Sequence, residues 1–305
     1  RKNINLFILH PHNKISNIQR KIMTTIGGKN IYNIAINGSF DDCQKIVKQM
    51  FADNLFRQTI NMSGVNSINW ARIIFQIVYY FYSFLRMNYK KINFSVPTGN
   101  FGDIYAGYMA KKMGLPIEKL IVATNENDIL QRVINKGIYK PTKVKSSLSP
   151  SMDIQISSNF ERLLFYVLKS KDFEVKKLMN NLEIKGYFRL TNNQKKIIQK
   201  DFAAFKATNK ETKKTIKNIY KKNNFFVDPH TATGFYAANK IKNKYPCIVL
   251  GTAHPYKFLE TMIKVTGKKI KKPSQLSKLM TGKEKYNVLS NKTNIIKKYI
   301  LEKHY

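Results

Sequence analysis

The segment SVPTGNFGD at residues 95–103 offers the clearest chemistry in this chain. An apolar run at 92–96 enters Pro97 and a Thr-Gly-Asn turn, and a helical pattern follows. Ligands of parallel α/β sheets bind at the carboxyl ends of strands. Glycine lets the backbone approach a ligand closely, and the unpaired N–H groups of a helix N-terminus attract anions. Residues 98–102 are therefore a candidate phosphate cradle, and the alternative is a plain strand-to-helix turn capped by Asn100.

The sequence lacks the signatures of several other binding sites. It contains neither G-x-x-x-x-G-K-[ST] nor G-x-G-x-x-G followed by an acidic residue, so nucleoside triphosphate or dinucleotide binding is not supported. Cys43 and Cys247 lie far apart, and His10 and His12 have no further partners at metal-ligand spacing. We expect no metal site, and two free thiols in a reducing compartment, which favours the cytoplasm.

The basic charge is the most unusual feature of the composition. The chain has 54 Lys and Arg residues against 18 Asp and Glu, a formal net charge of +36. Only 8 of the basic residues are Arg, and the 46 Lys are scattered over nearly every segment. Specific recognition of phosphates and bases tends to recruit Arg, because its planar fork matches them. We interpret the charge as a general Lys bias without a specific nucleic-acid partner; a basic nucleic-acid-binding scaffold is the alternative outside the enzymes.

Alternating strands and helices must position the candidate cradle. Strands are expected at residues 5–9, 32–36, 92–96, 120–123 and 247–250, and helices at 16–26, 40–52, 101–113 and 256–265. Ser16 is a suitable N-cap, and Asp41 and Asp42 favour the start of the helix at residue 40. This alternation predicts an α/β fold with mostly parallel sheets flanked by helices.

The middle of the chain has a more helical pattern. Helices are expected at 160–169, 173–181, 191–200 and 208–223, and loops at 136–153 and 268–272. The most apolar stretch, 68–85, is interrupted by Arg72 and Gln76. It is too short and too interrupted for a membrane span, so we expect a helix buried on most of its faces and no membrane partner.

Several segments together resemble one enzyme family. SVPTGNFGDIYAGYMAKKMGLPIEKLIVATNENDIL closely resembles the pyridoxal 5'-phosphate (PLP) phosphate-binding region of threonine synthases. HPHNKISNIQRKIMTTIGG is similar to the family's P-x-x-K-I-S-x-x-Q segment, and INGSFDDCQKIVKQMF to its DG-x-F-D-x-C-Q segment. NSINWARI, SMDIQISSNFERLL, DPHTATG and GTAHPYKF follow in the family's order. The resemblance covers residues 5–265 and, more loosely, the tail.

The resemblance implies a PLP fold like that of the tryptophan synthase β subunit. It also implies conversion of O-phospho-L-homoserine and water into L-threonine and phosphate, by a cytoplasmic monomer or homodimer. Residues 1–88 are then expected to be the remainder of an N-terminal α/β domain. Residues 89–305 would form the C-terminal, PLP-phosphate-binding domain, with a helical insertion around 155–243.

The cofactor contacts implied by the resemblance lie in two places, the loop residues Gly99, Asn100, Phe101, Gly102 and Asp103, and Thr252. Main-chain N–H groups of the loop would hold the cofactor's phosphate. Asp103 cannot favourably face that dianion, so we expect it to brace the loop by accepting N–H bonds. The Thr252 hydroxyl would meet the pyridine nitrogen and leave it largely unprotonated. An N-cap for the following helix is the alternative role for Thr252.

The substrate brings its own phosphate, so a second anion site is needed. Four residues of NSINWAR are the candidates: Asn66, Ser67, Asn69 and Arg72. An Arg fork suits a phosphate bidentately; a helix cap with a buried Arg satisfied by carbonyls is the alternative. Asn159 and Arg162 are weaker candidates of the same kind. His230 and His254 are assigned no proton-transfer role.

One family feature is missing. Threonine synthases carry their Schiff-base lysine in a Phe-Lys-Asp context, followed by a Thr-Ser-Gly-Asp-Thr-Gly loop, both before the equivalent of residue 1. Neither occurs here: Lys171 and Lys200 precede Asp, but follow Ser and Gln. We therefore expect an N-terminally truncated threonine synthase with no catalytic residue of its own, inactive by itself. Another PLP lyase or dehydratase of the same fold is the alternative among enzymes, although NSIN and SSNFER argue against it.

Overall fold

The computed structural model describes residues 3–66, 69–242 and 244–304. Contacts divide the chain into two compact units. The first comprises Arg1–Ser63, Tyr256–Leu259 and Lys269–Tyr305, and the second Gly64–Pro255 and Glu260–Lys268. These units differ from the division expected at residue 88. The long apolar helix belongs with the second unit, and the C-terminal tail belongs with the first.

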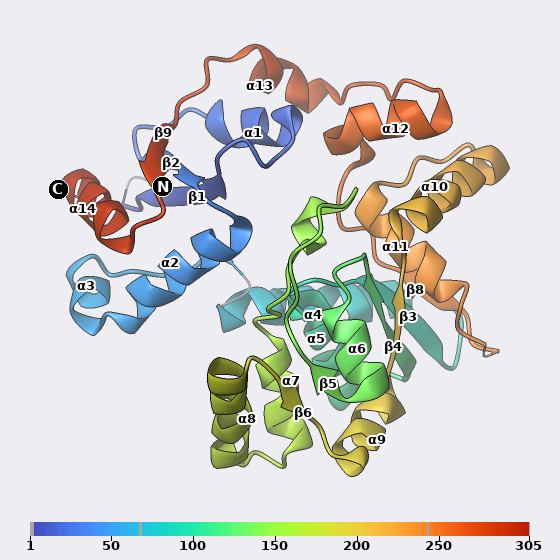
Figure 1. Ribbon diagram of the computed structural model, residues 1–305. Coiled ribbons are helices and arrows are strands. Elements are labelled where there is room, and N and C mark those ends of the chain that lie inside the picture. The colour runs from blue at the N-terminus through green and yellow to red at the C-terminus, as the bar shows by residue number, and fades with distance from the viewer. Residues whose placement is uncertain (1–2, 67–68, 243, 305) are drawn as a thin grey trace. The chain divides into compact units, whose positions relative to one another are not determined.

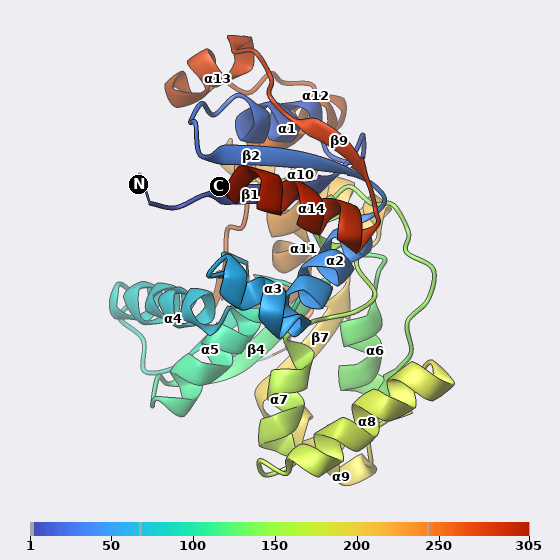
Figure 2. The same cartoon turned by 90° about the vertical axis from the view of Figure 1, so that its left-hand side faces the viewer.

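The first unit is a three-stranded parallel sheet with helices packed on it (Figure 2). Its strand order is β1 (Leu6–Pro11), β2 (Ile31–Asn37) and β9 (Asn287–Ser290). Its helices are α1 (Asn17–Thr24), α2 (Phe40–Ala52), α3 (Asn54–Thr59), α13 (Ser277–Thr281) and α14 (Thr293–His304). Ile34 and Ile36 of β2 share a core with Ile296 and Ile300 of α14. The tail joins this unit because β9 pairs with β2, a pairing that the short sequence NVLS did not predict.

Side-chain caps fix the helix starts expected in this unit. Ser16 accepts a hydrogen bond from the Gln19 N–H and precedes α1, as predicted. α2 has the predicted bounds and begins with a capping box between Ser39 and Asp42. The bonds from Ser39 lower the pKa of Asp42, so the carboxylate stays charged at the positive end of the helix.

The second unit is built on a four-stranded parallel sheet, which confirms the predicted fold class (Figure 1). Its order is β7 (Phe202–Lys206), β4 (Ile117–Thr124), β3 (Ile92–Pro97) and β8 (Cys247–Val249). The strand β7 was not predicted, because its five residues lie between two helical patterns. The stretch expected to be a helical insertion therefore contributes an edge strand.

Helices pack on both faces of this sheet. The helices from residue 70 to residue 266 are α4 (Trp70–Leu85), α5 (Gly102–Lys112), α6 (Ile129–Lys136), α7 (Phe160–Val167), α8 (Asp172–Lys185), α9 (Asn192–Asp201), α10 (Asn209–Asn223), α11 (Pro229–Ala238) and α12 (Leu259–Thr266). Phe94 and Val96 share the main core with α4, α5 and α6. Their neighbour Ser95 faces the other way and donates from Oγ to the carbonyl of Gly234 in α11, at 2.7 Å. The alternation along β3 thus separates the two faces. The antiparallel pair β5 (Ile138–Tyr139) and β6 (Phe188–Arg189) lies apart from this sheet.

The helix α4 is less buried than expected. Of its residues only Ile73 and Tyr80 are buried, while Phe75 is 71% and Leu85 76% exposed. The prediction of burial on most faces was wrong, because a single stripe of the helix packs on α5 and the sheet. Among the described residues, no helix is both long and apolar enough to cross a membrane.

α4 and α5 approach closely at Gly107. A Cβ atom there would lie 2.5 Å from Cε1 of Tyr80, so only glycine fits. The Tyr80 hydroxyl lies 2.8 Å from the carbonyl oxygen of Asp103 and 3.1 Å from its Oδ1, and donates to them. This contact fixes the first turn of α5, and burial raises the pKa of Asp103 to about 6.

Replacing Gly107 by Ala should lower the free energy of unfolding by roughly 1–3 kcal/mol, because overpacking at Tyr80 outweighs the better helix propensity of Ala. Urea unfolding followed by circular dichroism measures the change. Gly27→Ala is the matched control, since no atom lies within 4 Å of a Cβ built there. Equal losses in the two variants would contradict the close approach.

The Asp103–Tyr80 contact also predicts a pH dependence. Because the folded-state pKa of Asp103, about 6, exceeds its ordinary value of 3.8, protonation stabilises the fold, and this contribution is lost as pH rises through that interval. Asp103→Asn removes the titration and keeps an acceptor for Tyr80. Relative to the wild type, this variant should gain roughly 2–2.5 kcal/mol of stability between pH 4 and pH 7. A difference that stays constant with pH, in urea unfolding at both values, would show that Asp103 is not buried as described.

Candidate functional site

The turn at 98–102 and Thr252 leave the same edge of the second unit's sheet. Ser95 of β3 pairs in parallel with Val249 of β8, and the Leu250 N–H donates to the Ser95 carbonyl at 3.0 Å. Thr98 and Thr252 are each the third residue after this pair. Because the strands are adjacent and parallel, the two segments emerge next to each other, where ligands of such sheets bind.

The turn is held by its own polar groups. Thr98 donates from its N–H to the Ala123 carbonyl at 2.8 Å and from Oγ1 to the Val96 carbonyl at 2.6 Å. Asn100 Oδ1 accepts the Gly102 N–H at 2.9 Å. The N-cap of α5 is Phe101, which makes no side-chain cap bond, and Asn100, one residue before it, occupies the N–H of Gly102.

Phe101 takes an unusual backbone conformation in this turn. Its φ is +65°, in the left-handed region, which costs a non-glycine residue on the order of 1–2 kcal/mol. Its ring is wholly buried and packs against Phe160 and Phe202, with centroid distances of 5.3 and 5.6 Å. Burial of the ring offsets the backbone cost. Only the main chain of Phe101 is left to contact a ligand.

The turn retains main-chain donors. Among the hydrogen bonds of the described residues, none is donated by the N–H of Gly99 or of Phe101. Both groups lie beside the N-terminus of α5, whose first N–H groups have no partner within the helix. A Cβ atom on Gly99 would come within 3.2 Å of Cα of Met152, so the covering segment also requires glycine here. The arrangement suits an anion.

Asp103 does not oppose that anion. Its carboxyl is turned to the Tyr80 hydroxyl beneath the helix, and no N–H donor to it is found among the described residues. It therefore braces the first turn of α5 through a phenol, in place of the N–H bonds that we expected.

The SSNFER segment closes over the turn. Ser157 Oγ donates to the Gly99 carbonyl at 2.9 Å. Asn159 donates from its N–H and its Nδ2 to the Asn100 carbonyl, at 3.0 and 3.1 Å. Arg162 Nε in turn donates to Asn159 Oδ1 at 3.0 Å. The structure thus brings both weaker candidates, Asn159 and Arg162, to the turn.

The NSINWAR candidates lie around the start of α4. Asn69 is the N-cap: its Oδ1 accepts the Ala71 N–H at 3.0 Å and its Nδ2 donates to the Gly64 carbonyl at 2.7 Å. The Asn66 carbonyl accepts the Asn69 N–H at 3.0 Å, and Ser67 lies outside the described residues. The cap considered as an alternative is present.

Arg72 is exposed, so the alternative of a buried, carbonyl-satisfied Arg was wrong. Arg162, reaching from α7, instead lies over the ring of Trp70 at 5.4 Å, and Trp70 meets Tyr105 of α5 edge-on at 5.9 Å. The first turns of α4, α5 and α7 therefore meet beside the cradle. A guanidinium group and two asparagines lie among them.

Thr252 is exposed, and its N–H donates to Thr231 Oγ1 at 3.2 Å. No hydrogen bond of its own hydroxyl occurs among those described, including any to the helix that follows. The hydroxyl therefore has a lone pair and a proton to offer to a ligand at the sheet edge.

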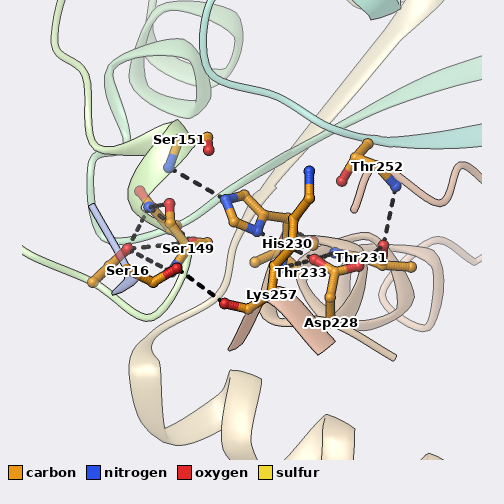
Figure 3. A network of polar contacts seen from close by, with 11 residues as sticks. Ser16, Ser149, Ser151, Asp228, His230, Thr231, Thr233, Thr252 and Lys257 are labelled. Carbon is orange, nitrogen blue, oxygen red and sulfur yellow. Dashed lines mark hydrogen bonds and ion pairs between the residues drawn. The ribbon is translucent and has the colours of Figure 1, made fainter. Parts of the chain in front are cut away.

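The residues that hold these segments belong to DPHTATG, for which no role at the site was predicted. Asp228, His230 and Thr231, at the start of α11, link Thr252 to Ser151 (Figure 3). An Asp directly before a Pro at the first helical position is a recognisable helix start, so the DPHT sequence carried a usable signal.

A second missed group follows β4. Asn125 and Asn127 donate from Nδ2 to Asp153 Oδ1 at 2.7 and 3.0 Å, and Ser147 also donates to this carboxyl. Burial raises the pKa of Asp153, and these bonds oppose that shift. The amides hold the segment around residue 153 against the sheet edge, where it covers Gly99.

Among the described residues there is no group of three His, Cys, Asp or Glu side chains that suits a metal ion. Cys43 and Cys247 are free thiols, and burial raises the pKa of each to about 12. They stay protonated near neutral pH.

Known proteins resemble this chain along nearly its whole length. The threonine synthase of Pseudomonas aeruginosa is 44% identical over 303 residues, which cover 98% of this chain and 65% of that protein. The structure of PLP-bound threonine synthase from Brucella melitensis has a TM-score of 0.89 at 44% identity, covering 98% of this chain and 65% of that one. The yeast threonine synthase structure has a TM-score of 0.86 at 41% identity, covering 99% and 65%.

The chain thus spans about 65% of the length of these relatives. A family model described as threonine synthase, C-terminal, matches residues 231–300. The matched region covers 98–99% of this chain and therefore extends over both compact units. In sequence and in backbone, the chain closely resembles the matching part of threonine synthases along nearly its whole length.

Proposed function

We propose that the protein containing this chain converts O-phospho-L-homoserine and water into L-threonine and phosphate, with PLP as its cofactor. In this proposal the chain supplies the cofactor's phosphate cradle and the partner of its ring nitrogen. The observation that carries it is the emergence of the donor-rich turn at 98–102 and of Thr252 from adjacent parallel strands at one sheet edge.

The residues present suit a phosphate monoester. The main chain of Gly99 and Phe101 offers N–H donors at the start of α5, and Asn100 holds the turn in shape. The carboxyl of Asp103, which follows the turn directly, is turned to the Tyr80 hydroxyl and so does not face a dianion at the turn. Gly102 would contribute through close approach, since its N–H is already used. When bound, PLP supplies an electron sink for carbanions formed next to the substrate's amino group.

Thr252 is proposed as the neutral partner of the cofactor's ring nitrogen. Its exposed hydroxyl can donate to an unprotonated nitrogen, whereas a carboxylate partner would favour the protonated form. This choice weakens the electron sink and leaves the timing of proton transfer to protein bases.

The second anion site is proposed where the first turns of α4 and α7 meet. The Arg72 guanidinium is exposed and can take a phosphate bidentately. Asn66, Ser67 and Asn69 would add donors from the same segment. Arg162, oriented by Asn159 and Trp70, adds a second positive charge for the substrate's phosphate.

We further propose that these 305 residues do not catalyse the reaction by themselves, because none of their lysines has the sequence context of the family's Schiff-base lysine. The cytoplasm is the proposed compartment, since Cys43 and Cys247 are unpaired. A monomer or homodimer without a specific nucleic-acid partner is the proposed state.

Gly99→Val is expected to weaken binding of pyridoxine 5'-phosphate about tenfold or more, because the new side chain would push the segment at Met152 away from the turn. This probe carries the ring and phosphate of PLP without its aldehyde, so it cannot form imines with the 46 lysines. Titration calorimetry gives the affinity, and Gly27→Val, in open space, is the control. Unchanged affinity for Gly99→Val would remove the turn from the site.

The inactivity proposal predicts no phosphate release from O-phospho-L-homoserine when the chain is assayed alone with PLP. Fusing to its N-terminus the part of the Pseudomonas aeruginosa threonine synthase that precedes the matching region should restore release together with L-threonine. Replacing Arg72 by Lys in the active fusion should raise KM at least tenfold, because the bidentate contact is lost. Turnover by the unfused chain would contradict the proposal, and a fusion that deaminates threonine instead would favour a dehydratase.

A further inference from the structure

The first turn of α11 joins both ends of the candidate cofactor site (Figure 3). Asp228 is the N-cap, and its Oδ1 accepts the N–H groups of His230 and Thr231 at 2.9 and 3.3 Å. The same Oδ1 lies 3.2 Å from His230 Nδ1, and Oδ2 accepts the Thr231 hydroxyl. Asp228, His230 and Thr231 are 1%, 4% and 6% exposed. One buried carboxyl therefore orients two side chains.

The proton positions in this group follow from the acceptors. The Thr231 hydroxyl has one proton, which goes to Asp228, so its lone pairs face the Thr252 N–H. His230 places Nδ1 beside Asp228 Oδ1, which assigns the ring proton to Nδ1. Nε2 is then an acceptor, as required by the Ser151 N–H that points to it at 3.2 Å.

The two side chains reach opposite ends of the site. Thr231 holds the main chain of Thr252, whose hydroxyl is the proposed ring partner. His230 holds Ser151 in the short helix η1 (Pro150–Met152). The last residue of η1, Met152, is the one whose Cα limits the space at Gly99. α11, which carries both His230 and Thr231, is fixed to β3 by the hydrogen bond from Ser95 Oγ to the Gly234 carbonyl.

We propose that Thr231 and His230 are positioning residues: Thr231 sets the main chain of Thr252 at the ring end, and His230 sets the 150–152 segment over the phosphate turn. This inference rests on the proposed function, because the two ends are defined by the cofactor. Neither residue contacts the ligand, and each acts through the segment that it holds.

Paired variants separate positioning from general stability. Thr231→Val removes the hydroxyl at nearly constant volume, and Thr231→Ser restores it. Thr233→Val is the matched control, because Thr233 lies in the same helix, is 1% exposed and bonds only the His230 carbonyl of its own helix, at 2.7 Å, among the described contacts. His230→Phe removes the acceptor for Ser151, and His230→Gln retains one.

Amide hydrogen exchange measures, without any ligand, how well the Thr252 amide is held by Thr231 and the Ser151 amide by His230. Thr231→Val should speed exchange of the Thr252 amide about three- to tenfold and leave the Ser151 amide unchanged, and His230→Phe should do the reverse. Thr231→Ser and His230→Gln should return the rates toward the wild type. Equal effects of Thr231→Val and Thr233→Val on both amides would overturn the inference.

The effect on the site is measured as the affinity for two probes, pyridoxine 5'-phosphate and inorganic phosphate. Thr231→Val should weaken pyridoxine 5'-phosphate about three- to tenfold and leave inorganic phosphate unchanged, because only the ring end moves. His230→Phe should weaken both probes. Wild-type binding that neither variant changes would overturn the inference and leave the proposed function standing. Failure of the wild type to bind pyridoxine 5'-phosphate would count against the proposed function, while the exchange rates would still decide the two contacts.

Discussion

The parallel pairing of β3 with β8 is the contact on which the candidate site depends. It joins segments that lie about 150 residues apart in sequence, and its register sets Ser95 opposite Val249. A shift of this register by one residue would turn the β8 side chains to the other face of the sheet, and Thr252 would no longer stand level with Thr98. Bonds on both sides of the strand protect the register: the Leu250 N–H to the Ser95 carbonyl, and Ser95 Oγ to Gly234 in α11.

Helix starts supply most of the chemistry at this edge. α5 offers main-chain donors, α7 closes over the turn through Asn159, α4 begins beside Arg162, and α11 begins with the buried Asp228. Each start has N–H groups without partners within its helix. Asn69 and Asp228 cap α4 and α11 with their own side chains. The Asn100 side chain accepts the first N–H of α5, and the Asn100 carbonyl accepts from Asn159 at the start of α7. If the turn binds a phosphate as proposed, donors held in this way need no rearrangement to bind it.

Electrostatics at the edge differ from what the composition suggests. The net charge of +36 is spread over lysines at the surface, and the proposed cradle relies on neutral N–H groups. The important electrostatic feature is the orientation of one acid: the Asp103 carboxyl is buried against the Tyr80 hydroxyl and so does not face the turn. The pKa of this carboxyl is raised because burial outweighs the hydrogen bond from Tyr80.

The sequence by itself determined the local elements and their order. The helix at Phe40–Ala52 was predicted to the residue, since an acidic first turn and an apolar stripe are local signals. The strand before the turn was also predicted, because the apolar run at 92–96 is followed directly by a turn sequence that contains Gly99 and Gly102. The family resemblance then supplied Thr252, which no local pattern singles out.

Only the tertiary structure decided which of these elements meet. β7 and β9 were missed, because strands of five and four residues gain their stability from partners distant in sequence. The exposure of Phe75 on α4 and the turning of Asp103 toward Tyr80 depend on which face each helix packs. The role of Thr231 is likewise invisible in the sequence, because a threonine hydroxyl becomes an acceptor for Thr252 only after Asp228 has taken its proton. Hydrogen bonds between distant segments are a property of the fold, and a residue's own neighbours in the chain do not encode them.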